Sequence, residues 1–394
     1  SLAIDIPRYI FTYSERYIRK NRWNRMISPP YIRVSGRIEL QVSVLTGLGA
    51  IGNYNQHATA KVIVNGKLYE VPVMTGNAFK HWHSVYLAEV YEALGGQNLN
   101  ELCKRGIGLR GYKVDTGYPN LTEANSECEA IKDICNDIHG LLVAKERRPF
   151  KRDSLFKASF LIPVLTEDNV KIASKFAVQH NRIIPSQIEV KETKEKRETK
   201  EETETKEKEE ALMMIFKQEY ATALYGFAIS ANLGLTLTPL YDSNCGLGIQ
   251  NLNEERKLRI KAAIIAFINL LMGSGSKQAR ALPIARLREL VVAVSNIPMP
   301  NLVHGSYPDY VKESLEIMKA YASVFDKENI EIDVMCYGVK CKDKVETSGT
   351  DQNKEKNASL NIEDYEDLSN LVENLINKAL APFQTQHTEK RNQR

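Results

Sequence analysis

Alternating polar and apolar residues mark the first element of the core. Between residues 31 and 44, polar side chains occupy nearly every second position and apolar residues stand between them. This period of two predicts a strand with one polar face. Farther along the chain, two short runs at 61–64 and 67–71 flank Asn65-Gly66, a dipeptide that strongly favours a two-residue hairpin turn.

Longer patterns predict the remaining elements. Helical periodicity, with apolar residues three and four positions apart, is clearest at 254–272. Thr75 or Asn77 is suited to cap a helix over 78–94. Because helices and strands mix without a regular βαβ repeat, the predicted fold class is α+β. The other predicted elements are helices at 122–138, 309–325 and 365–380, and strands at 156–165, 174–184, 213–231 and 287–295.

The composition is that of a globular protein. Of its 394 residues, 43% are hydrophobic and 26% are charged, which is ordinary for a soluble domain. No apolar run approaches the roughly 18 residues that a membrane span needs, and no signal-peptide pattern opens the chain, so we expect a cytoplasmic protein without membrane contact. The six cysteines lack a CxxC pair, so we expect reduced thiols rather than a disulfide scaffold or a structural zinc site.

Charge is unevenly distributed along the chain, although the net charge is only +4. Residues 189–210 contain ten glutamates and seven basic residues, a composition that cannot bury a core, so 188–211 is expected to be an insertion in one domain, either a solvated helix or a disordered loop. Basic surplus gathers at 1–28 and 145–157, which favours a polyanionic partner. We therefore divide the chain into a basic extension (1–28), a core with insertions (29–330), and a C-terminal strand, polar linker and terminal helix (331–394).

Recognisable catalytic motifs are absent from the sequence. It contains no GxxxxGK[ST], GxSxG or HExxH motif. His81 and His83 would point to different sides of a helix, so no metal site is expected. A histidine base with lysine support, drawn from His57, Lys80 and His81, would serve a metal-independent ribonuclease, and this alternative stays open.

Four loops combine glycine, basic and amide side chains, a mixture that suits an extended groove for single-stranded nucleic acid. One of them opens a helix and carries a lysine one turn along, where backbone N–H groups and an ammonium would face one anion. Each loop also has a simpler explanation by itself: an ordinary turn, a helix cap, solvated charge or a connector. The candidate contacts are Asn53 and His57, Thr75 and Lys80, Arg147, Arg148, Lys151 and Arg152, and Lys277 and Arg280.

Several motifs, in consistent order, resemble a known family. The first is Leu48-Gly-Ala-Ile-Gly-Asn53 followed by His57-Ala-Thr-Ala60, and the second is Val71-Pro-Val-Met-Thr-Gly-Asn-Ala-Phe-Lys-His81. Arg147-Arg148, His180-Asn-Arg182, Pro185-Ser-Gln187 and a glycine-rich loop before Leu282-Pro283 follow. Over residues 31–325 the chain is similar to the CRISPR Cascade backbone subunit of archaeal type I-A systems, in the DevR-type autoregulator branch of the RAMP superfamily.

The resemblance implies a fold, an assembly and a ligand. The fold would be an RRM-like (ferredoxin-like) palm with inserted helical and loop elements, shaped like a hand. Copies would polymerise into a helical filament along guide crRNA, hold its phosphates and present its bases to target single-stranded DNA in antiviral defence, beside other Cascade subunits. No catalytic residue, metal or cofactor is implied. The RNA-facing residues would be Asn53, His57, Thr75, Lys80, Arg147, Arg148, His180, Arg182, Gln187, Lys277 and Arg280.

Two other functions share parts of this picture. A RAMP-type metal-independent endoribonuclease that processes CRISPR RNA would have a related fold, and fold alone does not supply function. A DNA-binding transcriptional regulator would need a helix-turn-helix or a comparable element, which the sequence does not show. Cleavage of repeat RNA in EDTA would identify the first, and a gel shift on duplex DNA would identify the second.

Overall fold

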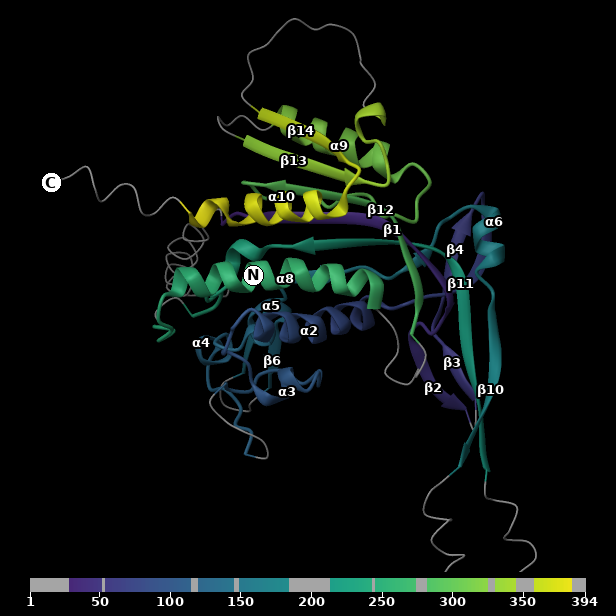
Figure 1. Ribbon diagram of the computed structural model, residues 1–394, viewed down its shortest axis with the longest axis horizontal. Coiled ribbons are helices and arrows are strands. Elements are labelled where there is room, and N and C mark those ends of the chain that lie inside the picture. Colours follow the sequence, from purple (N-terminus) through teal and green to yellow (C-terminus); the bar gives the residue numbers. More distant parts are fainter. Residues whose placement is uncertain are drawn as a thin grey trace, which may run out of the picture.

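A computed structural model describes residues 28–51, 54–114, 120–144, 149–183, 213–242, 245–273, 282–324, 330–344 and 358–384. One large mixed sheet lies at its centre, with helices packed against it (Figure 1). The predicted mixture of helices and strands is confirmed. No helix among these residues is both long and apolar enough to cross a bilayer.

The elements alternate irregularly along the chain. The α-helices are α2 (Gly76–Ala93), α3 (Glu101–Lys104), α4 (Glu127–Ala130), α5 (Ile134–His139), α6 (Glu167–Ile172), α8 (Leu252–Gly273), α9 (Tyr310–Val324) and α10 (Leu368–Leu380). The strands are β1 (Tyr31–Ser43), β2 (Gly47–Ile51), β3 (Tyr54–His57), β4 (Thr59–Val64), β5 (Lys67–Pro72), β6 (Leu141–Val143), β7 (Phe150–Arg152), β8 (Phe156–Ala158), β9 (Ile162–Pro163), β10 (Lys175–Ile183), β11 (Met213–Ala231), β12 (Ile284–Ser295), β13 (Ile330–Tyr337) and β14 (Ala358–Tyr365).

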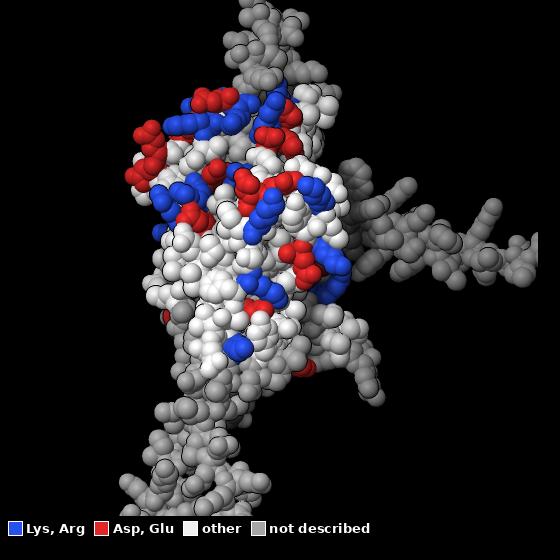
Figure 2. Space-filling model, turned by 90° about the vertical axis from the view of Figure 1, so that its right-hand side faces the viewer, with Lys and Arg blue, Asp and Glu red and all other residues white. Residues whose placement is uncertain are grey.

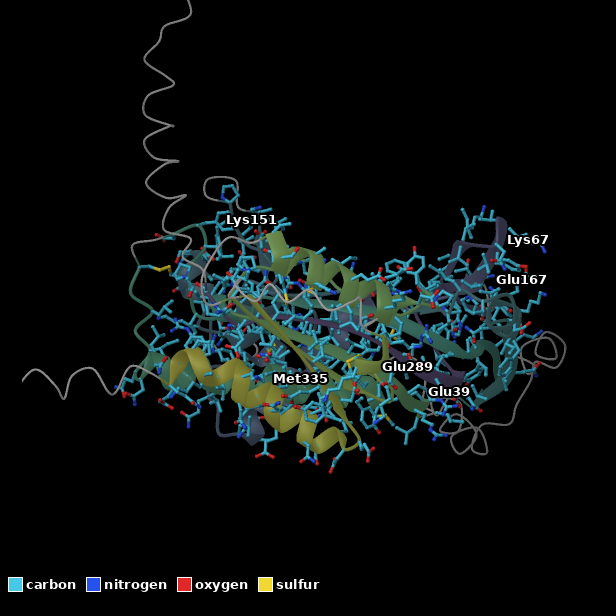
Figure 3. All side chains as sticks on the ribbon, turned by 90° about the horizontal axis from the view of Figure 1, so that it is seen from above. Glu39, Lys67, Lys151, Glu167, Glu289 and Met335 are labelled. Atoms are coloured by element: carbon cyan, nitrogen blue, oxygen red, sulfur yellow. A yellow bond between two sulfur atoms is a disulfide. The ribbon has the colours of Figure 1, made fainter. Side chains whose placement is uncertain are left out.

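Strand β1 is the centre of the large sheet. It pairs antiparallel with β11 on one side and with β12 on the other, and the strand order is β14-β13-β12-β1-β11-β3-β2. β10 pairs with the first half of β11, and together they extend beyond the rest of the sheet as a two-stranded ribbon (Figure 1). The β4–β5 and β6–β7 hairpins form separate small sheets. Lys151 of β7 and Lys67 of β5 lie toward opposite ends of the molecule (Figure 3).

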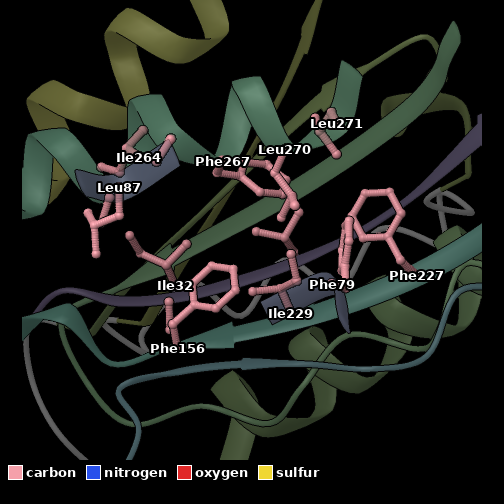
Figure 4. Packing of buried hydrophobic residues seen from close by; sticks show 14 of the residues in the cluster. Ile32, Phe79, Leu87, Phe156, Phe227, Ile229, Ile264, Phe267, Leu270 and Leu271 are labelled. Carbon is pink, nitrogen blue, oxygen red and sulfur yellow. The ribbon is translucent and has the colours of Figure 1, made fainter. Parts of the chain in front are cut away.

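The apolar face of β1 builds the main core. Successive strand residues point to opposite faces of a sheet, so Ile32, Val34, Ile38 and Leu40 all face the same side and all are buried. Helices α2 and α8 cover this side, and Figure 4 shows their apolar residues packed against Ile32 and against residues of β11. The alternation that predicted the strand therefore also determines which face carries the helices.

The polar face of β1 is buried as well. Ser35 Oγ donates a hydrogen bond to the Val303 carbonyl at 2.7 Å, and Arg37 Nε donates one to the Gly305 carbonyl at 2.8 Å. The segment from 299 to 308 thus lies across this face and supplies acceptors for its polar side chains. The approach is close, because a Cβ added at Gly226 would lie 2.0 Å from the backbone nitrogen opposite it. This part of the sheet is not open to a ligand.

Several predicted elements are confirmed and a few are wrong. The helices over 78–94, 254–272 and 309–325 form, as does the hairpin at Asn65-Gly66, where both turn residues have positive φ. The predicted helix over 122–138 instead divides into α4 and α5, because the Asp133 side chain accepts from the Asn136 N–H and begins a new helix there.

Three other predictions also need correction. The strand predicted over 156–165 is interrupted, so that only β8 and β9 form. The segment that carries Asn53 and His57, treated as a loop in the sequence, contains the paired strands β2 and β3. Within 331–394, where one strand, a polar linker and a terminal helix are expected, a second strand, β14, pairs in parallel with β13.

The cysteines also differ from expectation. All six form disulfides, which join Cys103 to Cys135, Cys128 to Cys245 and Cys336 to Cys341. The partners are 32, 117 and 5 residues apart in sequence, so tertiary folding rather than a short motif brings them together. The expectation of reduced thiols is wrong for this structure.

Candidate nucleic-acid interface

A cavity of about 450 Å³ lies between the start of α2 and the β6–β7 hairpin. Four segments far apart in sequence form its wall: α2, the chain after α3, the end of α5, and β7 with the residues after it. Its lining combines cationic side chains with polar groups and glycines. The lining residues are Asn77, Lys80, His81, Gly108, Arg110, His139, Gly140, Leu141, Arg152, Asp153 and Ser154.

Lys80 projects from α2 into this cavity. Its Nζ donates a hydrogen bond to the His139 carbonyl at 2.9 Å. Burial, together with the positive charges of Arg110 and Lys157, lowers the pKa of Lys80 to about 8. Lys80 is therefore close enough to both of these cations to be repelled by them.

Arg110 is the second cation of the cavity wall. It makes no hydrogen bond or ion pair with any residue that the structure describes, and burial lowers its pKa while Asp133 opposes that shift. Asp133 itself already accepts hydrogen bonds from the Asn100 and Asn136 N–H groups, at 2.9 and 2.8 Å. The positive charge of Arg110 is consequently not balanced by direct contact.

Two buried histidines, His83 and His139, lie beside Lys80 and hydrogen-bond to each other. His83 Nε2 lies 2.9 Å from the Ala263 carbonyl, which can only accept, and burial lowers the pKa of His83 to about 4. Neutral His83 therefore accepts at Nδ1 from His139 Nε2, 2.9 Å away. Both rings are fully packed. They support the cavity and are not placed to act as acid or base on a bound ligand.

Arg152, predicted to contact RNA, is buried at the border of the cavity. Its side chain has no exposed surface and forms ion pairs with Glu127 and Asp137. Arg259 of α8 also pairs with Asp137, at 2.9 Å. Arg152 therefore connects the segment around the β6–β7 hairpin to the core and has no donor left for a phosphate. Its neighbour Lys151 is exposed and lies over the Tyr241 ring, 5.1 Å from the ring centre.

His57, also predicted to contact RNA, lies in the interior. Its Nε2 accepts from the Leu45 N–H at 3.2 Å, its own N–H donates to Glu219 at 2.6 Å, and burial lowers its pKa to about 4. Tyr54 and Lys175 also contact the Glu219 carboxylate, at 2.7 and 3.1 Å. This cluster attaches β3 to β11 and gives His57 a structural role.

Thr75 caps α2. Its Oγ1 accepts from the Ala78 N–H at 3.3 Å, and its own N–H donates to Thr46 Oγ1 at 2.9 Å. The helix cap predicted from the sequence is confirmed, and the Thr75 hydroxyl is occupied in that role.

The remaining predicted contacts are placed only in part. His180 and Arg182 lie on β10, opposite Phe216 and Met214 of β11. Outside the described residues lie Asn53, Arg147, Arg148, Gln187, Lys277 and Arg280.

Neither the face shown in Figure 2 nor the clusters of metal-ligating groups among the described residues offer a second candidate site. On the face shown in Figure 2, basic and acidic side chains are interspersed, without a large patch of one sign. Groups with metal-ligand chemistry among the described residues each combine a cysteine pair with an aspartate, and disulfides occupy those thiols. Arg110 was missed by sequence reasoning. The available signal was a single arginine within Gly106-Ile-Gly-Leu-Arg-Gly111.

The protein is thus a mixed α and β scaffold with an open cavity, whose wall carries Lys80 and Arg110 without a carboxylate partner among the described residues. Comparison with known proteins identifies its family. The family model described as "CRISPR-associated negative auto-regulator DevR/Csa2" matches residues 34–315. The chain therefore belongs to the DevR/Csa2 family of Cas7-type RAMP subunits of Cascade, and the family resemblance is confirmed.

Three relatives are similar over most of their lengths. "CRISPR-associated protein Cas7/Cst2/DevR" of Thermoproteus tenax is 54% identical over 319 residues, covering 80% of this chain and 89% of the relative. The protein with the same description from Methanocaldococcus jannaschii is 35% identical, covering 73% and 88%. "CRISPR-associated aCascade subunit Cas7/Csa2 2" of Saccharolobus solfataricus is 27% identical, covering 76% and 94%.

Proposed function

We propose that this chain is a non-catalytic backbone subunit of an archaeal type I-A Cascade that binds guide crRNA through its phosphates. Family membership across residues 34–315 is the observation that carries this proposal. In the proposed assembly, an RRM-like palm holds the RNA, and copies form a helical filament with other Cascade subunits in the cytoplasm. The bound guide presents its bases to target single-stranded DNA.

The chemistry of the cavity supports an RNA-binding role. Phosphate contacts dominate sequence-independent binding of nucleic acid, and Lys80 and Arg110 provide two cations whose charge no described carboxylate neutralises by direct contact. None of the described lining residues is Phe, Tyr or Trp, which favours the RNA backbone over the bases as the group held there.

The test uses purified protein and labelled single-stranded RNA in EDTA, with a native gel beside a denaturing gel. Stepwise native shifts with intact RNA are the expected result, because each added subunit covers a further stretch of the strand. Complexes should weaken steeply as salt rises, since bound counterions are released from the RNA. No shift at low salt would contradict the RNA-binding role.

The same gels separate the alternatives. A shortened RNA on the denaturing gel would support the endoribonuclease, and loss of that product in His81→Ala would assign the histidine that borders the cavity. A shift on duplex DNA that exceeds the shift on RNA would support the regulator instead.

A further inference from the structure

The side chains of Lys80 and Arg110 have most of their N–H donors without an acceptor among the described residues. The Lys80 ammonium has three donors, and one of them reaches the His139 carbonyl. The Arg110 guanidinium has five donors, and none reaches a described residue. Both groups face the cavity between α2 and the β6–β7 hairpin, which we call the Lys80–Arg110 pocket.

Nearby acidic groups are already occupied. Asp133 is buried and accepts from two backbone N–H groups. Asp153 accepts from the Tyr241 hydroxyl at 2.7 Å and pairs with Lys151 at 3.6 Å. Desolvated charges without a partner are costly, so an anion that entered the pocket would relieve the repulsion between Lys80 and Arg110.

The lining limits what kind of anion fits. Among its described lining residues none is Phe, Tyr or Trp, so the pocket lacks the larger aromatic platforms on which bases stack. Asn77 instead adds an amide, whereas the Ser154 hydroxyl already donates to the Phe156 carbonyl at 2.6 Å. A volume of about 450 Å³ accommodates a phosphate with its sugar.

We propose that the Lys80–Arg110 pocket holds one phosphodiester of the bound RNA between the Lys80 ammonium and the Arg110 guanidinium. This assignment rests on the proposed function, because it takes RNA as the ligand, and it adds Arg110 as a binding residue. The grip is independent of sequence, since neither cation reaches a base edge.

Phosphate binding in this pocket takes up a proton. The pKa of Lys80 is about 8 in the free protein, and an adjacent phosphate favours the charged ammonium and raises this pKa. Deprotonation of the free protein above pH 8 therefore opposes binding. If the bound lysine titrates near its ordinary value, RNA affinity falls about tenfold from pH 7 to pH 9.

Other charged and titratable groups also face Lys80. Arg110 follows α3, Lys157 lies on β8, His81 shares α2, His139 ends α5, and Arg152 and Asp153 border the pocket from β7 and the residue after it. A Lys80→Arg variant isolates the lysine from all of them, because a guanidinium keeps its charge throughout this range.

Fluorescence anisotropy with a labelled RNA of adenosine and cytidine, whose bases do not titrate between pH 7 and 9, gives the affinities. Arg110→Ala should weaken binding about tenfold, equally on two unrelated sequences, and reduce the slope of log affinity against log salt by about 0.7. Lys80→Arg should lose the pH dependence, whatever its affinity at pH 7. Lys340→Ala, on the loop after β13, is the matched control and should bind as wild type does.

The possible results distinguish failure of the pocket assignment from failure of the proposed RNA-binding function. Failure of the wild-type protein to bind RNA would overturn both proposals. Wild-type binding together with an unchanged Arg110→Ala variant, or with pH dependence retained in Lys80→Arg, would overturn the pocket alone. Arg110→Ala should be at least as stable to urea as wild type, because it removes an unpaired cation. A lower midpoint would show that Arg110 serves the fold and would also overturn the assignment.

Discussion

Replacing Arg152 with alanine should destabilise the protein strongly. All five guanidinium donors of Arg152 are used. Two reach Glu127 and Asp137, and three reach the carbonyls of Asp137, Thr238 and Leu235 at 2.8, 2.9 and 3.1 Å. The side chain is fully buried, so water cannot take over these contacts when the guanidinium is removed.

The expected loss can be estimated from the charges left behind. Removing one partner of a buried ion pair costs about 3–5 kcal/mol. Glu127 would keep only the backbone donors of Leu240 and Tyr241, whereas Asp137 would keep Arg259. With a urea m-value of about 3 kcal/mol/M for a chain of this size, the unfolding midpoint should fall by about 1 M or more.

Urea unfolding followed by tryptophan fluorescence measures this loss. Lys151→Ala is the matched control, because the neighbouring side chain carries the same charge and is 55% exposed. Its midpoint should stay at the wild-type value. An Arg152→Ala midpoint within about 0.2 M of wild type, the scatter of ordinary surface substitutions, would refute this reasoning. A variant that folds normally but loses RNA affinity would restore the phosphate contact predicted from the sequence.

Three further substitutions test other parts of the fold. Gly226→Ala should lower the urea midpoint by overpacking, since its Cβ would lie 2.0 Å from backbone, whereas Gly246→Ala, with nothing within 4 Å, should not. Burial would raise the pKa of Glu219, but its hydrogen bonds and Lys175 lower it overall. The Glu219 carboxylate therefore stabilises the fold above about pH 4.5, and this stabilisation is lost as pH falls through the lowered pKa. Glu219→Gln should flatten the acid limb of a stability–pH curve. Cys128→Ser opens a disulfide that spans 117 residues and should cost about 4–5 kcal/mol, and reductant should cause no comparable additional loss through that bond.

Local patterns predicted the elements well where the chain's own periodicity decides the outcome. The alternation at 31–44 placed β1 and its buried face, and Asn65-Gly66 placed the hairpin. Pairings such as Ile32 with Ala231 join residues far apart in sequence, and no local signal specifies them. The helix predicted over 122–138 failed because Asp133 acts as a cap, which periodicity alone does not reveal.

The candidate site was predicted only where a local motif lay within it. Lys80 was found because it follows the cap of α2 by about one turn. Lys151 and Arg152 were treated as one basic cluster, yet successive residues of a strand point to opposite faces, and only Lys151 reaches solvent. Arg110 carries almost no local signal, because its importance comes from segments that folding brings together.

The two arginines that border the cavity differ in the hydrogen-bond partners of their guanidinium groups. Arg152 and Arg110 are both at least partly desolvated, and both carry charge that water would stabilise better. For Arg152, two carboxylates and three carbonyls replace that water, so its charge contributes to the fold. For Arg110, no described group makes that replacement, so the folded chain leaves its binding capacity for a ligand. The same residue type, at two positions on the wall of one cavity, thus supports the structure in one case and, as proposed, RNA binding in the other.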